Sequence, residues 1–190
     1  QAERTGAVVG IGGGSPLDAA KAIAVCAGAG MAVRAALKAD PAPCGMLPFV
    51  AVPTTAGTGS EATQYALLTD DARGDKLNLA TSASFPAAAL LDAELTATMP
   101  RDLTRDTGLD ALSHAVESML SERAQPLSSA MAEAAIARVA RHLPRVLDAP
   151  GDLDAREEML VAANLAGRAI AHTGTAACHA LSYHFTLRHG

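Results

Sequence analysis

The segment Ala7-Val-Val-Gly-Ile-Gly-Gly-Gly-Ser-Pro-Leu-Asp18 decides the fold class of this chain. Its first five residues, Ala7–Ile11, are a short apolar run that predicts a buried strand. The glycine-rich stretch Gly12–Ser15 ends this run, and Pro16 favours the start of a helix, which we expect over Leu17–Ala27. The order strand, glycine-rich turn, helix is typical of the first unit of an α/β fold.

A second loop of the same character follows the next apolar strand. That strand is expected at Phe49–Val52, and Pro53-Thr-Thr-Ala-Gly-Thr-Gly-Ser-Glu61 comes directly after it. Glycines let the backbone approach a pyrophosphate closely, and a helix N-terminus attracts its negative charge. Two such loops at the same ends of neighbouring strands face one crevice, where α/β sheets bind nucleotides. Neither loop is a GxGxxG or P-loop motif, so each alone also fits an ordinary tight turn.

The character of the sequence changes near residue 96, from short strands to helices. Three short strands are predicted at Tyr65–Leu68, Leu77–Ala80 and Ala88–Leu91. Helices are predicted over Arg101–Glu122 and from Pro126 onward. A third helix is predicted from an N-cap at Asp154 to about Ile170. A fourth is predicted over Ala176–Phe185, and we expect it to be buried.

We therefore place a domain boundary between residues 96 and 97. Residues 1–96 are expected to form the C-terminal part of an α/β nucleotide-binding domain with an incomplete parallel sheet. Residues 97–190 are expected to form the N-terminal part of an incomplete all-α domain. Because Gln1 shortly precedes a strand and Gly190 directly follows an apolar helical segment, we expect a central fragment of a longer protein.

Composition excludes several classes of partner. The formal net charge is −5 and no run of Lys or Arg occurs, which argues against nucleic acid and anionic membranes. No run of 18 apolar residues is free of charge, so no transmembrane helix is predicted. The three cysteines are odd in number and lack CxxC spacing, which argues against a disulfide framework and favours a reducing, cytoplasmic setting.

One helical segment combines a carboxylate with an imidazole. In Thr107-Gly-Leu-Asp-Ala-Leu-Ser-His-Ala-Val-Glu117, the spacing i, i+4 places Asp110 and His114 on one helix face, where both could hold one cation. His179 supplies a third imidazole in a later apolar segment. Such Asp/His pairs are also common on helices without a metal, and a buried histidine is often simply hydrogen-bonded in a core. Lys76 is a lone cation that could meet a ribose or phosphate, or be solvated at a strand edge.

Taken together, five segments resemble the iron-containing (group III) alcohol dehydrogenase family. They span nearly the whole chain: Gly12-Gly-Gly-Ser-Pro-Leu-Asp-Ala-Ala-Lys21, Pro53-Thr-Thr-Ala-Gly-Thr-Gly-Ser-Glu61, Leu91-Asp-Ala-Glu-Leu-Thr96, Thr107–Glu117 and His179-Ala-Leu-Ser-Tyr183. The resemblance implies an α/β nucleotide-binding domain followed by a helical domain, the dehydroquinate synthase-like architecture, with the active site between them.

The resemblance also implies the cofactors and the residues that hold them. NAD or NADP would be bound by Gly12, Gly13, Gly14, Ser15, Asp18, Thr54, Thr55, Thr58 and Lys76. A divalent metal, Fe²⁺ or Zn²⁺, would be held by Asp110, His114 and His179. The family's fourth ligand, a histidine in a Pro-His-Gly segment, is expected beyond Gly190. Many relatives carry a histidine where Tyr183 stands, whereas a tyrosine at this position is similar to a subset that includes phosphonoacetaldehyde reductases. Tyr183 is expected to relay a proton or orient the substrate.

The function implied is that of a metal-dependent NAD(P) oxidoreductase, homodimeric when complete, which interconverts a small alcohol and its aldehyde or ketone by hydride transfer. Within the superfamily, glycerol dehydrogenase, maleylacetate reductase and dehydroquinate synthase are the competing activities. A different alternative is a catalytically inert, truncated remnant that binds a nucleotide or a partner. A Pro-His-Gly encoded just downstream of Gly190 would favour the enzyme, and a stop codon there would favour the remnant.

Overall fold

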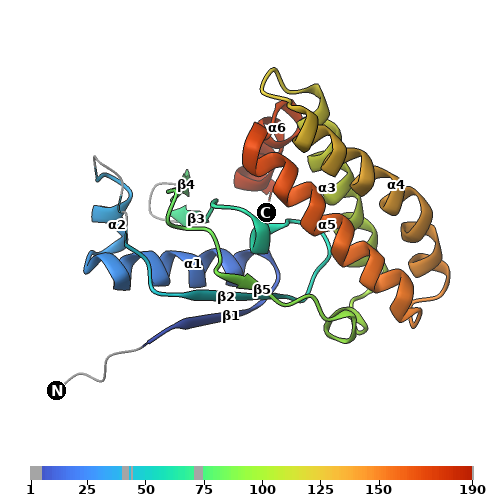
Figure 1. Cartoon of the computed structure of the whole chain (residues 1–190), viewed down its shortest axis with the longest axis horizontal. Helices are drawn as coiled ribbons and strands as arrows, with labels where there is room; N and C mark the ends of the chain where they lie inside the picture. Colours follow the sequence, from blue (N-terminus) through green and yellow to red (C-terminus); the bar gives the residue numbers. More distant parts are fainter. Residues whose placement is uncertain (1–5, 40–42, 44, 71–74, 190) are drawn as a thin grey trace.

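The structure is a computed structural model that describes residues 6–39, 43, 45–70 and 75–189. The side chains of residues 75, 183, 184 and 186–189 lie outside this description. An α/β part forms one end of the molecule and a group of helices forms the other (Figure 1). This arrangement confirms the predicted order of an incomplete α/β region followed by a helical region.

A three-stranded parallel sheet organises the α/β part. Its strands β1 (Val8–Gly12), β2 (Phe49–Pro53) and β5 (Ala88–Ala89) lie in the order β1-β2-β5. At the carboxyl end of the first pair, Gly12 is in register with Pro53. The two glycine-rich loops therefore leave the sheet next to each other, as their positions after neighbouring strands predicted.

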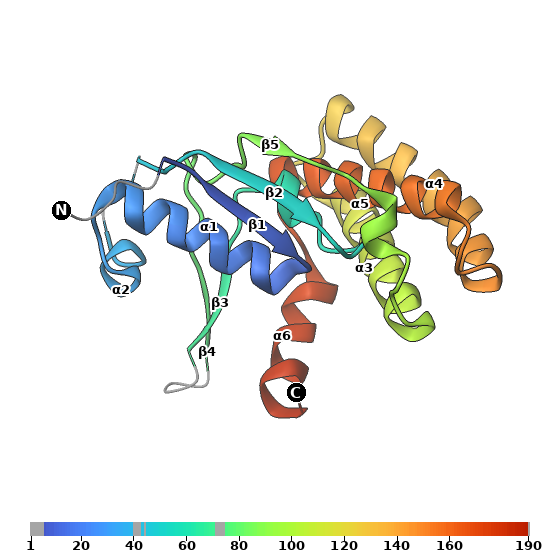
Figure 2. The same ribbon diagram turned by 90° about the horizontal axis from the view of Figure 1, so that it is seen from below.

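Helix α1 (Gly14–Ala29) runs along one face of this sheet (Figures 1 and 2). The close approach depends on small residues: a Cβ added at Gly10 would lie 2.9 Å from both Ala20 Cβ and Phe49 Cε2. Leu17 and Phe49 are fully buried between the helix and the strands. This packing holds the start of α1 beside the ends of β1 and β2, where the two glycine-rich loops lie.

Shorter elements connect the sheet to the helices. The turn of helix η1 (Ser60–Ala62) ends the second glycine-rich loop. An antiparallel hairpin of β3 (Leu67–Asp70) and β4 (Asp75–Asn78) follows it, beginning and ending about two residues away from the predicted strands. Two further short elements were not predicted, α2 (Val33–Ala36) and η2 (Ala93–Thr96). Both are four-residue pieces, too short to show a hydrophobic period.

The helical part is built mainly from three helices, α3 (Arg101–Leu120), α4 (Pro126–Asp148) and α5 (Leu153–Thr173). Alanines fill much of the shared interior, which lets the helix axes approach closely. The fully buried ones include Ala111, Ala115, Ala132, Ala135, Ala162, Ala166 and Ala169. None of the helices within the described residues has the length and apolar content needed to cross a membrane.

Two predictions about helix ends and burial were wrong. The N-cap of α5 is Asp152, whose side chain accepts a hydrogen bond from the Ala155 N–H at 3.0 Å, and Asp154 lies inside the first turn. The last helix, α6 (Ala177–His189), is not buried in this chain, because Leu181 and Phe185 are 61% and 66% exposed. Its apolar composition had indicated a core position, but among its described side chains only that of His179 is partly buried.

Two glycines of the second loop join the α/β part to the helices. A Cβ added at Gly57 would lie 2.7 Å from Thr107 Cβ on α3. A Cβ added at Gly59 would lie 2.6 Å from the Cα of Gly167 on α5. The loop is therefore wedged between α3 and α5, with no room for side chains at these two positions. This wedge places the two glycine-rich loops opposite the part of α3 that carries Asp110 and His114.

Candidate active site

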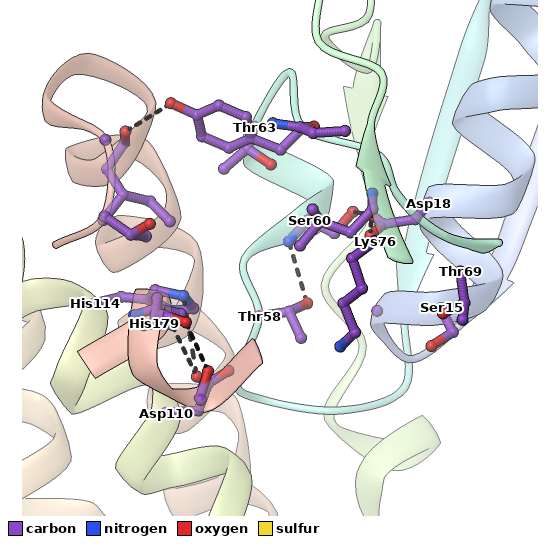
Figure 3. A pocket seen from close by; sticks show the side chains of 18 residues that line it. Ser15, Asp18, Thr58, Ser60, Thr63, Thr69, Lys76, Asp110, His114 and His179 are labelled. Carbon is purple, nitrogen blue, oxygen red and sulfur yellow. Dashed lines mark hydrogen bonds and ion pairs between the residues drawn. The ribbon is translucent and has the colours of Figure 1, made fainter. Parts of the chain in front are cut away.

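A cleft of about 530 Å³ lies between the α/β part and the helices. Figure 3 shows Ser15 and Lys76 at one side of this cleft, the Asp110, His114 and His179 group at the other, and Thr58 between them in this view. The lining residues are Gly14, Ser15, Asp18, Thr58, Ser60, Thr63, Tyr65, Leu67, Thr69, Lys76, Asn78, Asp110, His114, Ile170, Gly174, Thr175, His179 and Ser182.

The three side chains expected to bind a metal lie together at one wall of the cleft. Asp110 Oδ1 is 3.4 Å from His179 Nε2 and 3.9 Å from His114 Nε2. The two imidazole rings are stacked, with centroids 4.3 Å apart and planes inclined by 16°. One potential ligand atom from each residue lies within 4.8 Å of the others. Asp110 and His114 share a face of α3, whereas His179 comes from the first turn of α6.

The surroundings shift the pKa values of these three groups in different directions. Burial raises the pKa of Asp110, but the hydrogen bond with His179 and the charges of both imidazoles outweigh it, so the net pKa is below its ordinary value. Burial lowers the pKa of His114. The hydrogen bond to Asp110, with a further contribution from Glu117, raises the pKa of His179. An ionised carboxylate therefore faces one neutral and one readily protonated imidazole.

These residues fit a divalent metal ion. The separation of 3.4 Å between Asp110 Oδ1 and His179 Nε2 allows only a weak hydrogen bond, and the separation of 3.9 Å to His114 Nε2 is too long for one. Two donor atoms bound tetrahedrally to one zinc ion lie roughly 3.4 Å apart. A donor set of one carboxylate and two imidazoles suits Fe²⁺ and Zn²⁺. Their assignment as ligands remains a prediction.

The opposite wall is formed by the N-terminus of α1 and the second glycine-rich loop. Gly13, the N-cap of α1, has no side chain to accept the first N–H groups of the helix, and the first turn contains no acidic residue. The partial positive charge of this end is therefore available to a phosphate. A Cβ at Gly14 would lie 2.7 Å from Thr58 Cγ2, so the two loops touch each other within this wall.

The remaining predicted cofactor residues fall into two groups. Gly14, Ser15, Asp18, Thr58 and Lys76 line the cleft, whereas Gly12, Gly13, Thr54 and Thr55 do not. Members of the second group hold the loops together, since the Thr54 N–H donates to the Gly12 carbonyl at 2.9 Å and Gly13 faces the Thr55 side chain.

Asp18 has a structural partner on each carboxylate oxygen. It accepts hydrogen bonds from Ser60 Oγ at 2.6 Å and from the Leu67 N–H at 3.0 Å. Its direct contact with a cofactor therefore stays a prediction. Tyr183 lies in α6, but its side chain is outside the described residues, so its expected catalytic role is not assessed by the structure.

Comparison with known proteins decides the family. The model of the iron-containing alcohol dehydrogenase family matches residues 1–93, and the model of the C-terminal part of the Fe-containing alcohol dehydrogenase family matches residues 104–190. The chain belongs to the iron-containing alcohol dehydrogenase family. Its two halves match the two consecutive parts of the family, in the family's order.

Three similar proteins illustrate the range of activities in this alcohol dehydrogenase family. The chain is 41% identical to the probable alcohol dehydrogenase EutG of Salmonella typhimurium, over 93% of the chain and 45% of the relative. It is 42% identical to phosphonoacetaldehyde reductase of Streptomyces viridochromogenes, over 100% of the chain and 50% of the relative. A crystal structure of sulfoacetaldehyde reductase from Bifidobacterium kashiwanohense in complex with NAD⁺ superposes with a TM-score of 0.91 at 37% identity, covering 97% of the chain and 50% of that protein. The chain thus spans about half the length of the curated relatives it matches.

Two charged residues beside this cleft were not among the predicted site residues. Glu117 accepts hydrogen bonds from both the backbone and the ring of His179. Lys21 is fully buried and donates to Ser60 Oγ and to the carbonyls of Ser60, Thr63 and Tyr65 at 2.6–3.0 Å. Both residues belong to segments that carry the family resemblance. Glu117 also lies seven residues after Asp110, on the same face of the helix, and this spacing could have indicated its place near the site.

Proposed function

We propose that this chain supplies the cofactor- and metal-binding core of an NAD(P)-dependent alcohol dehydrogenase, which interconverts a small alcohol and its aldehyde or ketone by hydride transfer. The observation that carries the proposal is the shared cleft, lined on one wall by the N-terminus of α1 and on the other by Asp110, His114 and His179. A cofactor at the first wall and a polarising ion at the second would meet the substrate between them. Membership of the family supports the same reaction class.

On the nucleotide side, we propose that the backbone of Gly14 and Ser15 binds the cofactor diphosphate at the start of α1. Thr58, which contacts Gly14, would line the phosphate path, and Lys76 would meet the nicotinamide ribose. Gly12, Gly13, Thr54 and Thr55 would contribute by holding the two loops in register. The NAD⁺ complex of a structural relative supports a nicotinamide cofactor.

On the other wall, we propose that Asp110, His114 and His179 hold the divalent metal, Fe²⁺ or Zn²⁺. When bound, such an ion acts as a Lewis acid on the alcohol or carbonyl oxygen. The residues contribute orientation: Asp110 brings a negative charge between two imidazoles, and burial keeps His114 neutral so that a ring nitrogen is free to ligate. Tyr183 is proposed to relay a proton or orient the substrate, on the strength of its position in the family motif.

Further proposals concern the whole protein. A boundary between residues 96 and 97 is supported by the change from sheet to helices beyond η2. A homodimer is proposed on the strength of the family resemblance, and light scattering of the natural protein tests it. A reducing, cytoplasmic setting is supported by the free thiols of Cys26 and Cys178.

The proposed function is tested in the natural gene product that contains this chain. We expect about one Fe²⁺ or Zn²⁺ per chain, and activity with NAD or NADP on a panel of small alcohols and aldehydes that includes phosphonoacetaldehyde. Asp110→Asn removes a charged ligand, so we expect loss of the metal in elemental analysis and a fall in kcat of at least about 100-fold. NAD binding, measured by calorimetry, should persist.

The matched control is Asp106→Asn, which removes an exposed carboxylate one turn earlier on the same helix. It should keep both metal and activity. Full metal content in Asp110→Asn would overturn the metal assignment. Nucleotide binding without turnover of any substrate by the metal-loaded protein would support the inert remnant instead.

A further inference from the structure

A single carboxylate contacts both the backbone and the ring of the third expected ligand. Glu117 lies on α3, with 8% of its side chain exposed. Its Oε1 is 3.1 Å from His179 Nδ1 and 3.3 Å from the His179 backbone nitrogen, which donates to it. Its Oε2 accepts a hydrogen bond from the Ala176 N–H. One side chain from α3 therefore binds the beginning of α6 at three points.

The backbone contacts explain how α6 begins. The first N–H groups of a helix have no partner within the helix and need acceptors from elsewhere. Ala176 and Ala177 have no polar side chain that could accept them, so Glu117 performs this function from a segment 59 residues earlier. A negative charge also interacts favourably with the positive end of the helix. This alone would make Glu117 a structural cap.

The contact with the ring goes beyond capping. A neutral imidazole carries its proton on one nitrogen, and a carboxylate beside Nδ1 favours the tautomer in which Nδ1 is protonated. Nε2 of His179 then has a free lone pair, and this atom faces Asp110 Oδ1 at 3.4 Å. A second carboxylate that binds the far nitrogen of a ligating histidine is a recurrent way to orient the ring and raise its basicity.

His114 provides an internal contrast. Among the described residues its buried Nδ1 has no carboxylate partner comparable to Glu117, although the backbone of Gly57 interacts with the ring and its Nε2 also faces Asp110. His114 is already placed by its position on α3, one turn from Asp110. His179 belongs to α6, and Glu117 holds the first turn of α6 against α3.

We propose that Glu117 is a positioning residue of the metal site, which fixes both the place of His179 and the tautomer that leaves its Nε2 free to ligate. The proposal rests on the proposed function, since it assigns Glu117 a role toward the same ion. Loss of the Glu117 carboxylate should therefore change the metal affinity and the tautomer of the His179 ring, in addition to the stability of α6.

The test compares Glu117→Gln and Glu117→Ala with Glu122→Gln in the natural gene product. Glu122 is exposed just after the end of α3, so its substitution removes the same charge without a contact to His179. Zinc affinity is measured by competition with a chelator. We expect Glu117→Ala to lower it by about 10- to 100-fold. Glu117→Gln keeps an acceptor oxygen and should lose less, and Glu122→Gln should match the unmodified protein.

The second readout is the ¹⁵N chemical shift of the His179 ring nitrogens in metal-free protein at alkaline pH, with circular dichroism to follow helix content. We expect the Nδ1–H tautomer in the unmodified protein and a shift toward the Nε2–H tautomer in Glu117→Ala. An unchanged zinc affinity in Glu117→Ala would overturn the proposal. So would weaker zinc binding with an unchanged tautomer and reduced helix content, which would show a cap alone. If the unmodified protein binds no zinc or iron, it is the proposed function that fails.

Discussion

Gly59 and Gly167 meet backbone against backbone where the second glycine-rich loop crosses α5. A Cβ at Gly167 would lie 2.7 Å from the Gly59 carbonyl oxygen, and a Cβ at Gly59 would lie 2.6 Å from the Gly167 Cα. Gly59 also has a φ of +61°, a conformation that favours glycine. This contact fixes how closely the loop that carries Thr58 approaches the helical part.

We predict that Gly167→Ala destabilises the protein. Alanine in a helix interior is favoured over glycine by about 1 kcal/mol. The added methyl group would, however, collide with a backbone oxygen that cannot move independently, and overpacking of this kind costs about 1–3 kcal/mol. We therefore expect a net loss of up to about 2 kcal/mol in the free energy of unfolding, measured by urea denaturation. Gly151→Ala, whose Cβ meets nothing within 4 Å, is the control. A gain in stability at Gly167 would contradict the contact.

Lys21→Met is predicted to be more damaging. The ammonium group is fully buried, and burial lowers its pKa to about 8, against the attraction of Asp18 and Glu61. Methionine fills the space but removes the positive charge that attracts Asp18 and Glu61, and it leaves the carbonyls of Ser60, Thr63 and Tyr65 without their donor. Breaking a buried charged network costs about 3–5 kcal/mol. Thermal and urea unfolding should show this loss, whereas Lys38→Met, at an exposed position, should change stability by less than about 0.5 kcal/mol. Equal effects of the two substitutions would refute the role of Lys21.

Gly14→Ala tests the proposed binding of the cofactor at the start of α1. Its Cβ would lie 2.7 Å from Thr58 Cγ2, so Thr58 must turn, although its Oγ1 accepts a hydrogen bond from the Ser60 N–H at 3.3 Å. We expect a rise of about tenfold in the KM for the nicotinamide cofactor, corresponding to about 1.4 kcal/mol. Steady-state kinetics with Gly6→Ala as a control checks this, because a Cβ at Gly6 meets nothing within 4 Å. A KM equal to that of the control would exclude this loop contact from cofactor binding.

Metal affinity should fall as the pH is lowered, beginning at a higher pH than for an ordinary histidine. Asp110, together with Glu117, raises the pKa of His179, so a proton competes with the ion at this nitrogen already above the usual range. The competition is absent well above the raised pKa and grows as the pH falls through it. His114, whose pKa is lowered by burial, joins only at lower pH. Chelator competition at several pH values should show a loss on the order of tenfold per pH unit in the first step. An affinity that is constant from alkaline to mildly acidic pH would rule this out.

Patterns among residues close in sequence correctly predicted the first strand and helix and the shared helix face of Asp110 and His114. The strand before Gly12 and the helix after Pro16 follow from apolar runs and a proline, and both are present. The shared face of Asp110 and His114 follows from helix periodicity alone. The family resemblance assigned His179 to the same site, and the structure stacks its ring on that of His114, with Asp110 Oδ1 3.4 Å from its Nε2. Their role as ligands still awaits measurement.

The errors have a common physical origin. The exposure of α6 could not be predicted from its composition, because burial depends on which other segments reach it. The N-cap of α5 was placed at Asp154 by a capping pattern, but Asp152 also receives a hydrogen bond from Arg145 at 2.7 Å, an interaction across the turn between α4 and α5.

The hydrophobic periodicity, the turn-forming residues and the order of the motifs were enough to predict an α/β region followed by helices. Each of these signals depends on residues that lie only a few positions apart in the sequence. Contacts between distant segments are seen only in the tertiary structure. They are the hydrogen bonds of buried Lys21 to the carbonyls of residues 60–65, the backbone contact of Gly59 with Gly167, and the contacts of Glu117 with His179. These contacts bring together groups that are 39 to 108 residues apart. No local pattern encodes such distances, since they arise only when sheet and helices pack.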